Sequence, residues 1–246
     1  MKEKQKLENY ITKYKDESLW EVFETKHYVF HYPKDSIAER EIVHISITQE
    51  QAYTHIMSIL KIKENPLKIQ YYIYSSEKDK DVLMGDDGFA QALWDDYSIH
   101  IIYTEDIKPI GAHEDTHLLT LPWGVAIGFF QEGLAEYMRG CTWGKDKKSG
   151  EYFVQEGMAK NVIPSLESFL SHIFWTENSG EKAEYYYPLA GVFTRFLIEK
   201  FGLDKYRDFY QKIHRDNSLE ENKKIFEGII GDFNEVKKGC LQTISE

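Results

Sequence analysis

Cysteine is scarce in this chain. Only Cys141 and Cys240 occur among 246 residues, and neither has a second cysteine close by. Two cysteines cannot form the dense disulfide framework that holds small secreted domains together, and no motif marks either one as a catalytic nucleophile. We expect two reduced, mostly buried thiols, whereas a single long-range disulfide between them would require an exported protein.

Long apolar runs and an excess of positive charge are also missing. No hydrophobic stretch approaches the roughly 18 residues that a membrane helix needs, and residues 1–10 are charged where a signal peptide would be apolar. As written, the chain is expected to be soluble and cytoplasmic, or exported if a leader was removed. The formal net charge of −11 repels phosphate backbones and argues against a nucleic-acid partner.

The residues that are abundant predict a folded α+β protein. Hydrophobic residues make up 42% of the chain and aromatic residues 15%, which is typical of a protein with a sizeable core. Alternating runs rich in β-formers predict strands at 27–32, 67–74, 89–93 and 98–103. Helical spacing of apolar residues predicts helices at 4–18, 36–60, 76–84, 109–121, 129–140, 151–161, 165–174, 187–201, 203–215, 218–229 and 232–244.

These elements fall into two halves. Strands and helices are mixed over 1–140, a loop follows at 141–150, and the rest of the chain to 246 is predicted to be helical. No linker between the halves is long enough to require a domain boundary. We therefore expect one domain over 1–246, with an αβ subdomain at 1–140 and a helical subdomain at 141–246. The oligomeric state cannot be predicted from these patterns.

The predicted helix at 109–121 carries an HExxH motif formed by His113, Glu114 and His117. Two histidines four residues apart on a helix lie about 40° apart around its axis, with side-chain stems roughly 5–6 Å apart. Both can therefore turn a nitrogen toward one metal ion, while Glu114 lies beside that ion without needing to bind it. This spacing is typical of two imidazole ligands for zinc and a carboxylate that takes a proton from water.

Two further acidic residues could complete such a site. Catalytic zinc takes three protein ligands and keeps a fourth position open, and Glu132 and Glu136 follow His117 on the next predicted helix. They lie one turn apart on the same face of that helix. One can bind the metal while the other supports a ligand imidazole by hydrogen bonding. The spacing alone leaves open which residue has which role.

With these residues the chain resembles the gluzincin metallopeptidases, a zincin-like family. In that family the third ligand is a glutamate followed by glycine or alanine, and an acidic residue one turn later braces a ligand histidine. The string EGLAEY at 132–137 matches this pattern, so the resemblance makes Glu132 the ligand and Glu136 the brace. The 14 residues between His117 and Glu132 are fewer than in the best-known members. Glu136 would restore their spacing, so the swapped assignment stays open.

The resemblance also implies a fold and further site residues. The fold has an αβ half with a small sheet, a helical half, and the zinc site where they meet. The strand before the metal helix, at 96–103, is expected to be a sheet edge on which an extended peptide adds by backbone pairing. Tyr187, at the start of a helix with Pro188 in its first position, resembles the tyrosine that holds the oxyanion in small gluzincins. Tyr186 is the next choice, and both could instead be packing aromatics.

The function implied by this resemblance is zinc-dependent peptide hydrolysis. A Zn²⁺ ion would be held by His113, His117 and Glu132, with Glu114 as the general base and a peptide or protein as substrate. Nothing before His113 matches the Gly-x-Met-Glu-Asn strand by which related aminopeptidases read a substrate amino terminus, so an endopeptidase is favoured.

Two alternatives belong to other classes of protein. One is a zinc-binding interaction or inhibitory module without turnover. The other is a structural zinc or a chance motif, with the helical half serving a partner interface. Five of the other histidines, His27, His31, His100, His172 and His214, are expected to be structural, and among the last two His172 is the better candidate to reach the site.

Overall fold

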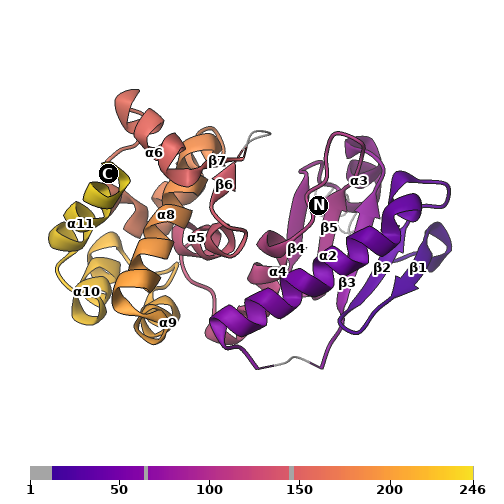
Figure 1. Ribbon diagram of the computed structural model, residues 1–246, viewed down its shortest axis with the longest axis horizontal. Helices are drawn as coiled ribbons and strands as arrows, with labels where there is room; N and C mark the ends of the chain where they lie inside the picture. The colour runs from indigo at the N-terminus through magenta and orange to yellow at the C-terminus, as the bar shows by residue number, and fades with distance from the viewer. Residues whose placement is uncertain (1–12, 64–65, 144–146, 246) are drawn as a thin grey trace, which may run out of the picture. The chain divides into compact units, whose positions relative to one another are not determined.

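The computed structural model describes residues 13–63, 66–143 and 147–245 of the chain (Figure 1). Within them the fold is α+β, with a small mixed sheet in the first half and mainly helices in the second. The chain divides after Leu119 into two compact units, residues 1–119 and 120–246. This division comes before the expected boundary at 140, because the helix at 128–138 packs against a later helix of the second unit, at 183–201. The helix predicted at 4–18 lies mostly outside the described residues.

Among its described residues, the first unit contains five strands and three α-helices. Its strands are β1 (Glu21–Glu24), β2 (Tyr28–Tyr32), β3 (Ile69–Tyr74), β4 (Ala90–Leu93) and β5 (Ser98–Ile102). Its helices are the 3-10 helix η1 (Glu17–Leu19) and the α-helices α2 (Ile37–Leu60), α3 (Glu77–Met84) and α4 (Ala112–Leu119). The four predicted strands and the helices at 36–60 and 76–84 are confirmed. The helix predicted at 109–121 is shorter at both ends, so Pro109, the first residue of the predicted helix, lies outside it.

The order of the strands corrects one prediction. The sheet runs β1-β2-β3-β5-β4, in which β2, β3 and β5 are parallel and β1 and β4 are antiparallel to their neighbours. β5 therefore lies inside the sheet with all five residues buried, and the prediction of a sheet edge at 96–103 is wrong. The chain reverses between β4 and β5 at Tyr97, whose φ is 48°. This hairpin places β4, instead of β5, at the edge.

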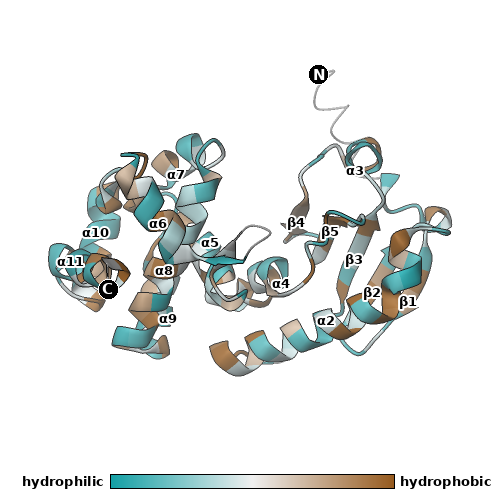
Figure 2. Ribbon diagram, turned by 45° about the horizontal axis from the view of Figure 1, so that its top comes forward, coloured by the Kyte–Doolittle hydropathy of each residue, from teal (hydrophilic) through white to brown (hydrophobic). Residues whose placement is uncertain are grey.

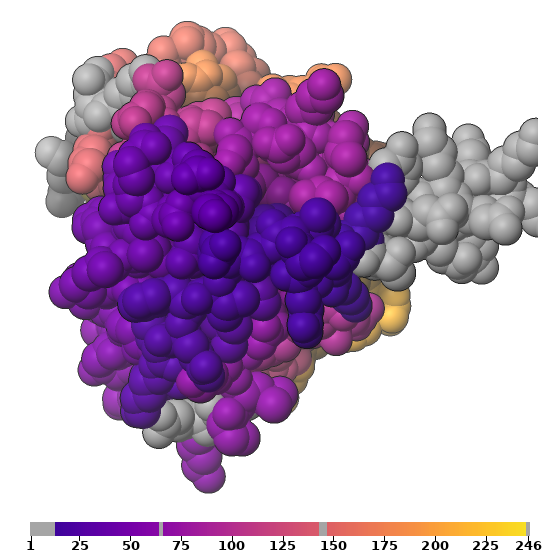
Figure 3. Space-filling view, turned by 90° about the vertical axis from the view of Figure 1, so that its right-hand side faces the viewer, coloured from indigo at the N-terminus to yellow at the C-terminus, as the bar shows by residue number. Residues whose placement is uncertain are grey.

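Helices α2 and α4 cover one face of the sheet, and a hydrophobic cluster that includes Met84 of α3 lies on the other. α2 packs against β2 and α4, and α4 packs against β4 and β5. α2 carries hydrophobic and hydrophilic patches in turn along its length (Figure 2), as expected for a helix with one buried face. The other face of the sheet is covered by a cluster of Tyr14, Trp20, Tyr74 and Met84. The end of the sheet formed by β1 faces the viewer in Figure 3.

The second unit is built mainly of helices. They are η2 (Leu121–Trp123), α5 (Gly128–Met138), α6 (Gly150–Ala159), η3 (Leu166–Leu170), α7 (His172–Asn178), α8 (Ala183–Phe201), α9 (Leu203–Lys212), α10 (Leu219–Ile229) and α11 (Phe233–Ser245). The predicted loop at 141–150 contains a short hairpin of β6 (Thr142–Trp143) and β7 (Lys148–Ser149). This hairpin lies within the predicted loop, and the described residues after it are mainly helical, as expected. The helix predicted at 165–174 is divided into η3 and α7.

Two glycines allow α5 and α8 to pack closely. A Cβ atom added at Gly133 would lie 2.6 Å from the backbone oxygen of Ala190, and one added at Gly191 would lie 2.6 Å from the Cβ of Glu136. Neither distance leaves room for a side chain. The backbones of the two helices therefore approach each other through glycine, and α8 fixes the position of the helix that carries Glu132 and Glu136.

The structure bears on two expectations from the sequence, which concern membrane helices and the two cysteines. No helix among the described residues is long and apolar enough to cross a membrane. Cys141 and Cys240 are both buried free thiols, as expected. Burial raises the pKa of Cys141 to about 11 and that of Cys240 to about 12, so both stay protonated near neutral pH.

Candidate metal centre

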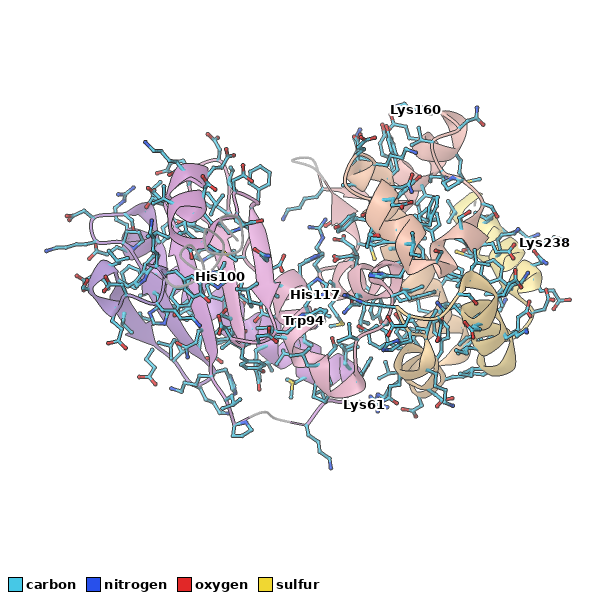
Figure 4. The ribbon with its side chains drawn as sticks, turned by 180° about the vertical axis from the view of Figure 1, so that it is seen from behind. Lys61, Trp94, His100, His117, Lys160 and Lys238 are labelled. Carbon is cyan, nitrogen blue, oxygen red and sulfur yellow. The ribbon has the colours of Figure 1, made fainter. Side chains whose placement is uncertain are left out.

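α4 presents the residues of the HExxH motif on one side. The rings of His113 and His117 have their centroids 5.2 Å apart, and Nε2 of His113 lies 4.0 Å from Oε1 of Glu114. The side chains of His113 and Glu114 are 21% and 13% exposed, respectively. Figure 4 labels His117 on this helix. The three groups are thus partly accessible, as a metal site open to a substrate requires.

The opposite side of α4 is held by a buried polar network. Asp115 lies about 200° around the helix from His113 and is fully buried. Its carboxylate accepts hydrogen bonds from the hydroxyl of Tyr28 and from Nε2 of Gln49, the latter at 2.6 Å. Oε1 of Gln49 accepts from the backbone N–H of Gly111 at 2.6 Å. Burial raises the pKa of Asp115 to about 7, against the lowering effect of these two side-chain donors.

α5 carries the two candidate acidic ligands in different surroundings. Glu136 is buried, and its Oε2 accepts a hydrogen bond from Nε of Arg139 at 2.8 Å. Glu132 is partly exposed. Each of His113, His117 and Glu132 offers one ligand atom, and these atoms all lie within 4.8 Å of one another. No other group of three or more metal-ligating side chains is found within the described residues.

The chemistry of this cluster fits zinc. Two imidazoles and one carboxylate form a donor set that catalytic zinc accepts, with a fourth position left for water or substrate. With bonds of about 2.0–2.1 Å, ligand atoms around a tetrahedral ion lie about 3.4 Å apart. The ligand atoms of this cluster lie within 4.8 Å of one another, an upper limit somewhat wider than that spacing. Glu132, and not Glu136, is the acidic residue grouped with the two histidines.

The beginning of α5 is fixed by side chains from later in the second unit. The backbone N–H of Gly128 donates to Nδ1 of His172 at 3.2 Å. Arg215 donates from Nε to the backbone oxygen of Ala126 at 3.2 Å, and its NH2 group donates to Oε1 of Gln131. Burial lowers the pKa of Arg215, while nearby Tyr210 and Glu132 act in the opposite direction. His172 and Arg215 therefore hold the first turn of the helix that presents Glu132.

The structure changes the setting of Tyr187. α8 begins at Ala183, so Tyr187 is its fifth residue and Pro188 lies inside the helix. The prediction that Tyr187 opens this helix with Pro188 in the first position is wrong. The ring of Tyr187 packs on Trp175 with centroids 5.3 Å apart, and Tyr186 is fully buried. The oxyanion role of Tyr187 stays a prediction. Its expected position at the start of a helix no longer supports that role.

Five of the other histidines have structural contacts. His27 stacks on Tyr53 and its Nδ1 lies 2.5 Å from Oε2 of Glu50. His31 bonds to the side chain of Gln70, at 2.9 Å. The remaining three are His100, fully buried within β5, His172, which caps α5, and His214, which follows α9 and bonds through its backbone N–H to Asn222.

Sequence reasoning did not identify Gln49, Asp115 or Arg215. For Gln49 a signal existed: it is a polar residue at a position where the apolar stripe of α2 continues from Ile45 to Ala52. Asp115 lies within the HExxH motif but on the side away from the histidines. No local pattern distinguishes Arg215 from the other charged residues of its helix-rich region.

The comparisons with known proteins add no assignment to this geometry. No family model matches the sequence, and no curated protein matches it. The candidate metal centre therefore rests on the residues and distances described above.

Proposed function

We propose that this protein is a zinc-dependent metallopeptidase with a gluzincin-like fold. The observation that supports this most strongly is the grouping of His113, His117 and Glu132, with ligand atoms within 4.8 Å of one another. Glu114 lies next to this group on the same helix. The motif was identified from its spacing and Glu132 from the family resemblance, both without coordinates, so their proximity is an independent argument for a common site.

The roles of the residues follow from their chemistry. A zinc ion in this cluster would supply Lewis-acid catalysis, polarising the substrate carbonyl and lowering the pKa of a water molecule to near 7. Glu114 takes a proton from the attacking water at its carboxylate and gives it to the leaving amine. Tyr187 donates a hydrogen bond to the oxyanion. Glu136 holds a ligand imidazole in place by accepting its free N–H.

The sheet offers a place for a peptide or protein substrate. β4 pairs with β5 on one side and ends the strand order on the other. It contacts α4, the helix of the HExxH motif. An extended peptide can add to such an edge through backbone hydrogen bonds. The strand that binds substrate in this proposal is therefore β4, and recognition along a peptide backbone favours an endopeptidase.

The direct test measures cleavage of casein or a mixed peptide library with and without a chelator. The wild-type protein should bind about one zinc ion per chain, and its cleavage should stop when zinc is removed and return when zinc is restored. Glu114→Gln should keep the zinc and lose most of the cleavage, because the amide cannot take a proton. Full activity in this variant would exclude Glu114 as the base. Zinc binding without cleavage in the wild type would favour an interaction or inhibitory module.

A matched pair of variants identifies the third ligand. Glu132→Gln should lose far more zinc affinity than Glu136→Gln, because the first removes a metal ligand and the second an indirect support. Zinc affinity is measured by competition with a chromogenic chelator, and thermal melting checks that both proteins fold. The opposite order of affinities would assign the ligand to Glu136.

A further inference from the structure

We propose that Gln49 and Asp115 are positioning residues that set the orientation of the HExxH helix for metal binding. This inference rests on the proposed function. It concerns the side of α4 that faces away from the histidines. Gln49 belongs to α2, which is separated from α4 by β3, α3, β4 and β5 in the chain. The contact between them is therefore a tertiary one.

Hydrogen bonding fixes the orientation of the Gln49 amide. The backbone N–H of Gly111 can only donate, so the atom 2.6 Å from it must be the oxygen of Gln49. Nε2 then faces Asp115 and donates to Oδ2 at 2.6 Å. The hydroxyl of Tyr28 donates to the other carboxylate oxygen. All of these side chains are fully buried, so solvent cannot replace a lost bond without a substantial cost.

These hydrogen bonds attach α4 to α2 at two points. Gly111 lies directly before α4, where a helix has N–H groups without intrahelical partners, and Gln49 accepts from one of them. Asp115 lies in the first turn, on the side of α4 opposite His113 and His117. The side chain of Gln49 thus links both the residue before α4 and the buried side of α4 to α2. A rotation of α4 about its axis would break these bonds, so the network sets the direction in which the two imidazoles point.

The test compares the zinc affinities of variants, with the zinc ion alone as the probe. Gln49→Leu removes both bonds at similar volume and should weaken zinc binding by about 10-fold or more, as is typical when groups that orient metal ligands are removed. The double variant Gln49→Glu with Asp115→Asn again places one carboxylate and one amide together. Glu at position 49 can accept from Gly111 and from the new amide, and that amide can accept from Tyr28. Its affinity should return to within about 3-fold of the wild type.

Controls separate positioning from general stability. Gln70→Leu removes a glutamine bond to His31 on the other face of the sheet and should leave zinc affinity unchanged. Tyr28→Phe removes one donor to Asp115 and should weaken zinc binding less than Gln49→Leu. Thermal melting of the metal-free proteins shows which variants are folded at the temperature of the assay. If Gln49→Leu does not fold, Tyr28→Phe decides the question.

The outcomes are distinct. Weaker binding in Gln49→Leu that is restored in the double variant supports the inference. Unchanged affinity in folded Gln49→Leu, or in Tyr28→Phe if that variant must decide, overturns it and leaves the peptidase proposal intact. Wild-type protein that binds no zinc overturns both.

Discussion

His100 should make the folded protein sensitive to acid. Its ring is fully buried in β5, stacked on Tyr72 with centroids 4.9 Å apart, and its nitrogens bond to the side chains of Tyr74 and Ser98, each at 2.9 Å. Burial lowers the pKa of His100 from its ordinary 6.5 to about 3, and nearby Lys80 acts in the same direction. The folded protein therefore keeps this imidazole neutral at pH values where the unfolded chain binds a proton.

The sign and size of the effect follow from proton linkage. A histidine with a lowered pKa contributes stability that is complete above about pH 6.5 and is lost as the pH falls toward about 3. Between about pH 7 and pH 5 the loss from this one residue is about 2 kcal/mol. This figure changes little with the folded pKa as long as that pKa stays below about 4, because the unfolded chain then supplies nearly all of the proton binding.

Denaturant unfolding at about pH 7 and pH 5 measures this loss. The free energy of unfolding of the wild type should fall by about 2 kcal/mol more than that of His100→Asn, which keeps an acceptor for Tyr74 but cannot titrate. Tyr74→Phe serves as the control, since it should be less stable at both pH values and keep the pH dependence. Equal pH dependence in the wild type and His100→Asn would refute this account of the buried ring.

Three further predictions concern the second unit. Gly133→Ala should lower the free energy of unfolding by roughly 1–3 kcal/mol, because the new Cβ would lie 2.6 Å from a carbonyl oxygen of α8. Calorimetry should show a lower melting temperature for this variant than for the control Gly180→Ala, because no atom lies within 4 Å of a Cβ added at Gly180. Cys141 and Cys240 should react with a thiol reagent only slowly until denaturant is added, and rapid reaction of the native protein would contradict their burial. Tyr187→Phe should reduce peptide cleavage about 100-fold with zinc content unchanged, and an unaffected rate would exclude the oxyanion role proposed for Tyr187.

Local patterns predicted the parts of the candidate site that depend on local geometry. Histidines four residues apart lie on one side of a helix wherever that helix is placed, so the grouping of His113 and His117 required only that α4 be a helix. The grouping of Glu132 with them required in addition that the next helix begin near Gly128, where the connection ends. Spacing did not distinguish Glu132 from Glu136, because both lie on the same face of α5, and the coordinates group Glu132 with the two histidines.

The remaining features depend on contacts between distant parts of the chain. The position of β5 inside the sheet is decided by pairing with β3 and β4, which the residues of β5 alone do not specify. α8 begins before Pro188 although proline usually marks a first turn, because Tyr186 is buried against Phe169 and this packing supports an earlier turn. The role of Gln49 likewise depends on α4, a helix far along the sequence.

The composition of β4 has a consequence for handling the protein. Its four residues, Ala90–Leu93, contain no charge and no proline, which are two of the features by which natural edge strands avoid pairing with other chains. At high concentration, and without a peptide laid along it, this strand can template the same strand of a second molecule. Such pairing would be seen as self-association that rises with protein concentration and is suppressed by the substitution Gln91→Lys.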